Sequence, residues 1–259
     1  MSNDKGIIVF GMSVNLKNII RMEWKFVNRR ATLFVANPFN ITEDILPLYV
    51  SEFSKMNLLP SVNKGVGFKI TPQGIEQEEV LSLDLKYLDN TLKVNFGPDR
   101  ADIESTKVGE TWESFRTIVD KIVNILSTNL NHRVVRLALC GSIVYSMDED
   151  KSMKIYTKLA KIKNEQPVEW LLRKVLRTKL TTDDGAKSVI VNNVYQLTNT
   201  ILIPGINIRK GVLLDMDINT LVGTSADNII AIQDKFWTNA SSVIDEAVVH
   251  YQSVFEDDD

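Results

Sequence analysis

The last fifty residues of the chain carry its most regular pattern of apolar and polar positions. Between positions 229 and 254, apolar residues recur three or four apart, at Ile229, Ile232, Phe236, Ala240, Val243, Ala247, Tyr251 and Val254. This spacing predicts one amphipathic helix over about residues 227–255, roughly 40 Å long. An alternating strand from Gly211 to Leu221 precedes it, so we expect the apolar stripe to pack on a sheet.

The first half of the chain reads mainly as strands. Short β-rich runs over 7–16, 21–28 and 31–35 predict three strands, with a hairpin turn at 28–30 between the last two. A helix is expected over 42–56. The alternating runs at 81–87 and 92–96 predict a hairpin with a two-residue turn at Asp89-Asn90.

Helical periodicity returns at Thr111, which is a candidate cap for a helix over 111–126. The nearly continuous apolar run at 133–147 predicts a central strand that is covered on both faces. Two basic helices are expected over 151–163 and 168–180. A turn at 183–185 then leads into two strands, 187–203 and 207–219, joined by a loop at Pro204-Gly205.

These elements predict an α+β fold with mostly antiparallel sheet, a helical insertion and a long C-terminal helix packed on the sheet. We expect a β-rich N-terminal half, residues 1–105, and an α/β C-terminal half, residues 106–259. The second half includes the basic helical insertion at 151–180 and the terminal helix at 227–255. The segment at 99–109 is the expected seam between the halves.

Composition indicates a soluble globular protein. Of its 259 residues, 44% are hydrophobic and 24% are charged, which allows a large core. We expect no secretory signal, because Asn and Lys follow the short apolar run near the N-terminus and no small-residue cleavage site appears. We expect no membrane partner, because no apolar run reaches the eighteen or so residues that span a bilayer. The single cysteine, Cys140, excludes an internal disulfide and any multi-cysteine metal site, and it is typical of a cytoplasmic protein.

Charge is distributed unevenly along the chain. The net charge is only −3, yet residues 151–179 contain an excess of seven positive charges. This basic segment predicts a binding face for an acidic partner, which could be a protein, a second copy of the chain or a nucleic-acid backbone. The alternative interpretation is a solvated face. The candidate binding residues are Lys151, Lys154, Lys158, Lys161, Arg173, Lys174 and Arg177.

Catalytic patterns are scarce. His132 and His250 lie far apart and are interpreted as surface or capping residues, and Cys140 in its apolar strand as an inert buried thiol. Asp215 and Asp217 alternate on a strand, so their carboxylates share one face, where they could help to hold a divalent cation or simply face solvent. We assign no catalytic residue, no metal site and no cofactor.

Two short segments, Glu23-Trp24-Lys25 and Asp84-Leu85-Lys86, match half of a metal-dependent nuclease pattern, in which acids bind Mg²⁺ and the lysine assists an attacking water. Neither has the expected Pro-Asp partner upstream. A grouping of Asp84, Asp215 and Asp217 around one pocket would favour an enzyme. A flat apolar or basic face would favour a binding protein.

Four segments of the chain together resemble a known family: TWESFRTIVDKIVNIL at 111–126, RVVRLALCGSIVY at 133–145, LLDMDIN at 213–219 and HYQSVF at 250–255. They resemble a sporadically distributed, uncharacterised family of prokaryotic proteins of about this length. Its members combine a W-x-x-F helix, an arginine-containing strand, an L-D-x-D strand and a long C-terminal helix. In this chain Cys140 stands where the family strand has its second arginine, and Ser142 and Ile143 stand at its tyrosine-containing end.

The patchy distribution of that family implies a mobile or defence-associated setting, including antiviral defence, but no established activity. We therefore expect a non-enzymatic binding or assembly subunit, with a protein partner or a homo-oligomer and with nucleic-acid binding as a further option. The alternative function is a metal-dependent nuclease or other hydrolase.

Overall fold

The computed structural model of the chain describes residues 24–72, 74–162, 167–200 and 210–256. Their elements, in chain order, are β1 (Trp24–Val35), α1 (Leu46–Ser54), β2 (Leu59–Thr71), β3 (Gly74–Lys86), β4 (Leu92–Phe96), β5 (Arg100–Ser105), α2 (Trp112–Asn124), the π-helix η1 (Ile125–Asn129), β6 (Val134–Ser146), α3 (Glu149–Ala160), β7 (Leu171–Thr181), β8 (Ser188–Thr200), β9 (Gly211–Thr220) and α4 (Ala226–Glu256).

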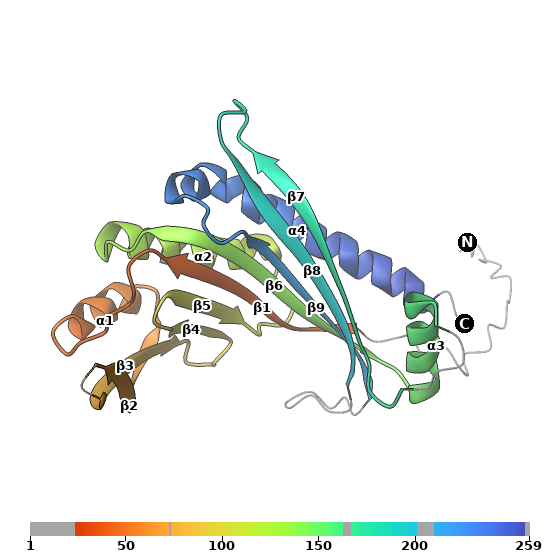
Figure 1. Cartoon of the computed structure of the whole chain (residues 1–259), viewed down its shortest axis with the longest axis horizontal. Helices are drawn as coiled ribbons and strands as arrows, with labels where there is room; N and C mark the ends of the chain where they lie inside the picture. Colours follow the sequence, from red (N-terminus) through yellow and green to blue (C-terminus); the bar gives the residue numbers. More distant parts are fainter. Residues whose placement is uncertain (1–23, 73, 163–166, 201–209, 257–259) are drawn as a thin grey trace, which may run out of the picture.

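The described strands form one sheet of nine, in the order β2-β3-β4-β5-β1-β6-β9-β8-β7, and every neighbouring pair is antiparallel. Helix α4 runs along one face of the sheet, where it packs on β6, β8 and β7 (Figure 1). The predicted fold class, an α+β protein with a mostly antiparallel sheet and a long C-terminal helix on it, is confirmed.

The core lies between the sheet and the helices α1, α2 and α4. One row of paired positions crosses the sheet on this side from β3 to β9, and each of its side chains is at most 4% exposed. The row consists of Leu85, Val94, Ile103, Ala31, Leu139 and Ile218. We call this the helix face, and the opposite side of the sheet the open face.

The predicted bounds of the terminal helix, 227–255, differ from those of α4 by one residue at each end. Its apolar stripe is buried from Ile229 through Phe236 and Ala240 to Tyr251, and Phe236 is fully buried. Toward the C-terminal end of α4, the buried positions are one residue later than the predicted apolar positions. Ile244 and Phe255 are fully buried there, whereas Val243 and Val254 are only partly buried.

Other predictions hold in outline. Thr111 caps α2, because its side chain accepts a hydrogen bond from the Ser114 backbone N–H at 3.1 Å. Strand β6 takes the predicted central place, between β1 and β9. The β3–β4 hairpin forms, but its connection has five residues, 87–91, with Asn90 at φ 57°, in place of a two-residue turn.

Two predictions of local structure are wrong. The turn expected at 28–30 lies inside the continuous strand β1, which absorbs the irregularity as a bulge between Phe26 and Asn28. The second basic helix, 168–180, is instead the strand β7. The apolar pairs 171–172 and 175–176 fit a helix, but the turn around Gly185, at φ 71°, folds this run back onto β8 as a hairpin.

The sheet crosses the expected seam between the two halves of the chain, because β1 pairs with β6 along most of its length. The strand predicted at 7–16 and the loop predicted at Pro204-Gly205 lie outside the described residues. No helix in the described part of the chain combines the length and apolar character needed to cross a membrane.

Candidate functional site

The seven basic residues predicted to share one binding face lie on two different elements. Lys151, Lys154 and Lys158 belong to α3, and Lys161 is its C-cap residue. Arg173, Lys174 and Arg177 belong to β7. The fold therefore divides the basic segment into a helical part and a strand part, which we consider separately.

Two of the lysines of α3 and its C-cap have structural roles. The Lys158 ammonium group donates a hydrogen bond to the Val254 carbonyl, at 3.2 Å, in the last turn of α4. This contact satisfies a carbonyl that has no partner within its own helix. Lys161 ends α3 in the left-handed conformation, with φ 56°. Lys154 and Lys161 have exposed side chains and remain the candidates for binding on this helix.

Strand β7 lies at the edge of the sheet (Figure 1) and pairs with β8 along its whole length. On its other side its backbone N–H and C=O groups face no strand among the described residues. Three aliphatic side chains of β7, those of Leu171, Val175 and Leu176, are 43–55% exposed. A long edge of this kind is a template for pairing with another extended segment.

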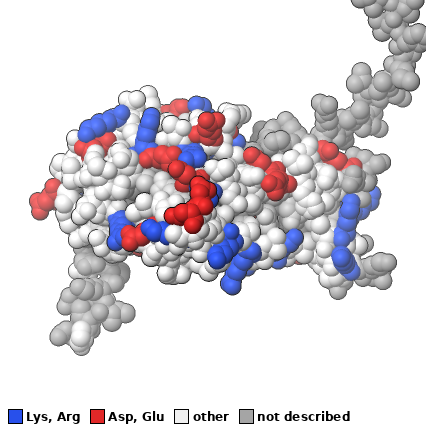
Figure 2. Space-filling view, turned by 90° about the horizontal axis from the view of Figure 1, so that it is seen from above, with Lys and Arg blue, Asp and Glu red and all other residues white. Residues whose placement is uncertain are grey.

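The cations of β7 point to both faces because side chains alternate along a strand. Arg173, Arg177 and Lys179 are on the open face and Lys174 is on the helix face, and all four are exposed. No acidic residue lies within Leu171–Thr181. In the view from above, Lys and Arg side chains gather mainly toward the edges of the molecule, whereas acidic side chains form a run through the middle (Figure 2).

A polar hollow of about 380 Å³ lies on the open face beside β7. Five neighbouring strands contribute to it, from β7 through β8, β9 and β6 to β1. Its polar lining residues are Arg173, Gln196, Asp215, Asp217, Ser142, Cys140, Asn28 and Arg30. The hollow therefore has arginines at its two ends and two carboxylates between them.

At the centre of the hollow, the charges of Arg30 and Asp217 act on the Cys140 thiol. The Arg30 guanidinium donates to the Cys140 sulfur at 3.6 Å. Burial, and next the charge of Asp217, raise the pKa of the Cys140 thiol to about 12, so the thiol stays protonated and unreactive at neutral pH. The Asp217 carboxylate has a side-chain hydrogen bond with the Cys140 thiol, so it belongs to the group of interacting residues at the centre of the hollow.

The acidic residues that were predicted to favour an enzyme come together only in part. Asp215 and Asp217 share the hollow, as their alternation predicts. Asp84 lies on β3, five strands away from β9, and accepts a hydrogen bond from Asn63 at 3.1 Å. Among the described residues, no three His, Cys, Asp or Glu side chains are grouped so that they could hold a metal ion.

The two histidines do not converge. His250 is exposed on α4, whereas His132 is buried just before β6, against the ring of Phe39. Its Nε2 atom lies 2.5 Å from the Tyr49 hydroxyl oxygen, and Nδ1 lies 3.3 Å from the Asn37 carbonyl oxygen. The expectation of a surface or capping role is therefore wrong for His132, which is a hydrogen-bonded core residue.

Sequence reasoning missed three groups of residues in this region. The turn expected at 28–30 hides the place of Asn28 and Arg30 on the open face, although their alternation with Thr32 is a strand signal. Gln196 lies on β8, where its alternation is hidden among polar neighbours. Lys179 continues the basic row of β7 and becomes recognisable only when that segment is assigned as a strand.

Comparison of the chain with models of known protein families and with curated proteins finds no match. The functional argument therefore depends on the geometry of the open face and of the β7 edge.

Proposed function

We propose that this protein is a non-enzymatic binding or assembly subunit that takes an extended, acidic segment of a partner protein along β7. One observation carries the proposal: β7 is an edge strand of eleven residues that contains four cations and no acidic residue. The four cations are Arg173, Lys174, Arg177 and Lys179. Backbone pairing would supply affinity, and charge would select an acidic sequence. The resemblance to a sporadic prokaryotic family supports a defence or mobile-element setting, and the single cysteine supports a cytoplasmic location.

A second copy of β7 is a poor partner for this edge. Antiparallel pairing centred on Val175 would place Arg173 opposite Arg177 of the second copy, and pairing centred on Leu176 would place Arg173 opposite Lys179. Like charges directly opposite each other destabilise a strand pair by about 0.2–1 kcal/mol each. The edge therefore disfavours self-association and favours a segment with acids at alternate positions.

The test compares two double variants with the same change of charge. Arg173→Glu with Arg177→Glu alters β7, and Lys154→Glu with Lys161→Glu alters α3. Binding of labelled acidic peptides, single-stranded DNA and RNA is measured by fluorescence anisotropy at several salt concentrations. We expect an acidic peptide to bind and the β7 variant to lose at least about tenfold in affinity, which is about 1.4 kcal/mol.

Hydrogen exchange then separates strand addition from general electrostatic attraction. The β7 amides that point away from β8 should exchange quickly in the unbound protein and slowly in the complex. Equal losses of affinity in the two variants, or no new protection in β7, would contradict the proposal. Preference for DNA or RNA over the acidic peptide would assign this edge to nucleic acid instead.

The rival function, a metal-dependent hydrolase, is favoured by the presence of Asp215 and Asp217 in one polar hollow. Two carboxylates alone leave most positions around Mg²⁺ to water or substrate. Calorimetric titration with Mg²⁺ and Mn²⁺, repeated with Asp215→Asn, tests this function. Saturable binding that the variant abolishes would support the hydrolase, and it would leave the peptide experiment unaffected.

A further inference from the structure

A second unpaired strand edge lies at the other end of the sheet from β7. At that end, β2 and β3 form a long hairpin (Figure 1). Strand β3 pairs with β2 over its whole length but with β4 only at Asp84–Lys86. Over residues 74–83, the side of β3 that is turned away from β2 therefore faces no strand among the described residues. We call this open stretch the β3 edge.

The β3 edge is the chemical complement of β7. Its sequence, GIEQEEVLSL, includes three glutamates and no cation, whereas β7 contains four cations and no acidic residue. Both edges also expose aliphatic side chains. Ile75 of the β3 edge is 73% exposed, and Leu171, Val175 and Leu176 of β7 are 43–55% exposed. Two edges of similar length and opposite charge are suited to pair with each other.

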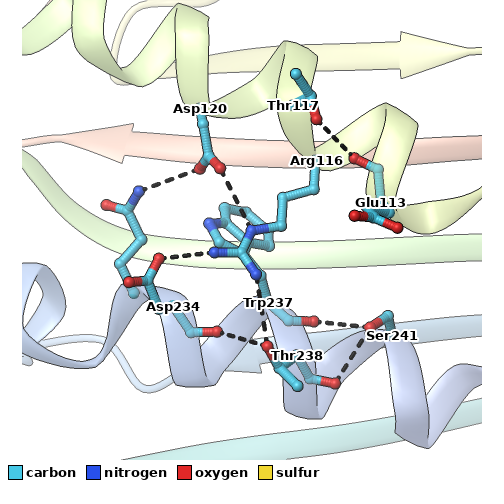
Figure 3. A network of polar contacts seen from close by, with 9 residues as sticks. Glu113, Arg116, Thr117, Asp120, Asp234, Trp237, Thr238 and Ser241 are labelled. Carbon is cyan, nitrogen blue, oxygen red and sulfur yellow. Dashed lines mark hydrogen bonds and ion pairs between the residues drawn. The ribbon is translucent and has the colours of Figure 1, made fainter.

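The positive charge of β7 is not compensated within the described part of the chain. On the helix face, by comparison, the Arg116 guanidinium is held by Asp234 at 2.7 Å and by Asp120 at 3.3 Å (Figure 3). None of the four β7 cations forms such an ion pair with a described residue. Arg177 donates to the neutral Asn192 amide oxygen at 3.2 Å. An acidic strand of a second molecule can therefore supply the missing negative charge.

The backbone groups of both edges point outward at odd-numbered residues. In an antiparallel pair, successive residues direct their N–H and C=O groups alternately toward the partner strand and away from it. The Tyr87 N–H donates to the Leu92 carbonyl on the β4 side, so odd-numbered residues of β3 face that side. The Thr182 N–H donates to the Lys187 carbonyl of the β7–β8 hairpin, so odd-numbered residues of β7 face away from β8. Antiparallel pairing of the two edges must therefore set odd-numbered residues opposite each other.

One register that meets this condition brings opposite charges together on both faces of the sheet. It sets Arg173 opposite Glu79 and, at the next position, Lys174 opposite Glu78. Opposite charges directly across a strand pair stabilise it, and no like charges are opposite each other anywhere in this register. Two copies of β7, in contrast, would set cation against cation.

We infer that β7 of one copy pairs with the β3 edge of a second copy of the chain. The inference rests on the proposed function and names its partner, because the acidic extended segment becomes residues 74–83 of another molecule. The two surfaces differ, so the contact is heterologous, and each pair of copies leaves one β7 and one β3 edge free. The expected assembly is an open head-to-tail row in which the sheet continues from one copy to the next.

Charge reversal at each edge tests this contact. One double variant, Glu78→Lys with Glu79→Lys, alters the β3 edge, and the other, Arg173→Glu with Lys174→Glu, alters β7. Sedimentation velocity of the full chain at several protein and salt concentrations measures assembly. We expect the wild type to form larger species as protein concentration rises and salt falls. Each variant alone should associate at least about tenfold more weakly.

A mixture of the two variants separates a lost contact from a misfolded protein. The reversed β7 of one variant is acidic and the reversed β3 edge of the other is basic, so assembly should return when the two are mixed. A variant that fails to fold could not be rescued in this way. Glu113→Lys with Glu246→Lys, at exposed positions of α2 and α4, is the control for reversal of two acids and should assemble like the wild type.

The acidic peptide distinguishes failure of this inference from failure of the proposed function. A peptide that binds to β7 should also dissolve the assembly by competition. If the peptide binds but the chain stays monomeric under all conditions, or if assembly persists unchanged in both variants, the inference is overturned and the proposed function stands. If neither the peptide nor a second copy binds to β7, both are overturned.

Discussion

The two faces of the sheet differ although they are built from the same strands. On the helix face, the row that begins with Leu85 and ends with Ile218 is apolar and buried. On the open face, the row formed by the neighbouring residue of each of these strands is almost entirely polar. It consists of Asp84, Asn95, Asp102, Thr32, Ala138, Asn219, Asn192 and Arg177.

The difference between the faces separates stability from recognition. Apolar area removed from water stabilises a fold by roughly 25 cal/mol per Å², so the helix face holds the molecule together. Exposed polar groups and surface ion pairs contribute little to stability. The exposed side chains of the β7 edge can therefore change without loss of the core, whereas Thr32, Ala138 and Asn219 of the open-face row are buried.

Substitutions in α4 should have the largest effect on stability. Phe236 is fully buried on the helix face, so we expect Phe236→Ala to lower the free energy of unfolding by about 3–5 kcal/mol. Tyr251→Ala, near the other end of the helix, should cost about 3 kcal/mol. Chemical denaturation measures both. Unchanged unfolding midpoints in both variants would mean that α4 is not part of the core and would remove the distinction between the faces.

Acidification should have an intermediate effect through His132. Burial lowers the pKa of this histidine below its ordinary value of about 6.5, so the folded state favours the neutral ring and the unfolded state binds protons more readily. The stability that this group contributes is therefore fully present above about pH 6.5 and is lost as pH falls below that value. Tyr49, with its pKa raised to about 12, stays neutral throughout.

Unfolding free energies measured between about pH 7.5 and pH 5.5 test the role of His132. We expect stability to fall with pH in this range, and the slope to become shallower in His132→Gln. His250→Gln is the matched control because that ring is exposed. A variant slope equal to that of the wild type would show that His132 is not the group that titrates.

Sequence patterns predicted correctly those elements whose spacing of apolar residues fits only one type of secondary structure. Helix α4 could be predicted because a stripe of this length is compatible only with a helix on a large apolar surface. The continuous apolar run at 133–147 placed β6 at the centre of the sheet, but the prediction that it is covered on both faces does not hold, because α1, α2 and α4 all lie on the helix face. Pattern reasoning failed at β7, where the apolar pair Val175 and Leu176 fits a helix as well as a strand, and tertiary pairing with β8 decides.

The candidate sites were less predictable than the fold because they depend on contacts between distant segments. Alternation alone placed Asp215 and Asp217 on one face. Their neighbours Arg30 and Arg173 come from strands separated by more than a hundred residues, and no local pattern joins those strands. Lys158 matched the basic stripe in the sequence, but its contact with the end of α4 is visible only in the fold.

The smallest effect on stability is expected on the open face, where it tests the comparison most directly. Asp215 is only partly buried, so we expect Asp215→Asn to change the free energy of unfolding by no more than about 0.5 kcal/mol. Leu214 precedes it on β9, points to the helix face and is fully buried. Leu214→Ala should cost about 2–5 kcal/mol.

Paired melting curves of Asp215→Asn and Leu214→Ala therefore measure the contrast between the faces at adjacent positions of one strand. A loss of more than about 1 kcal/mol in Asp215→Asn would show that the carboxylate stabilises the fold, because surface substitutions rarely have so large an effect. The polar hollow would then be part of the structural framework. A large cost at Leu214 with almost none at Asp215 is the result that leaves the open face to binding.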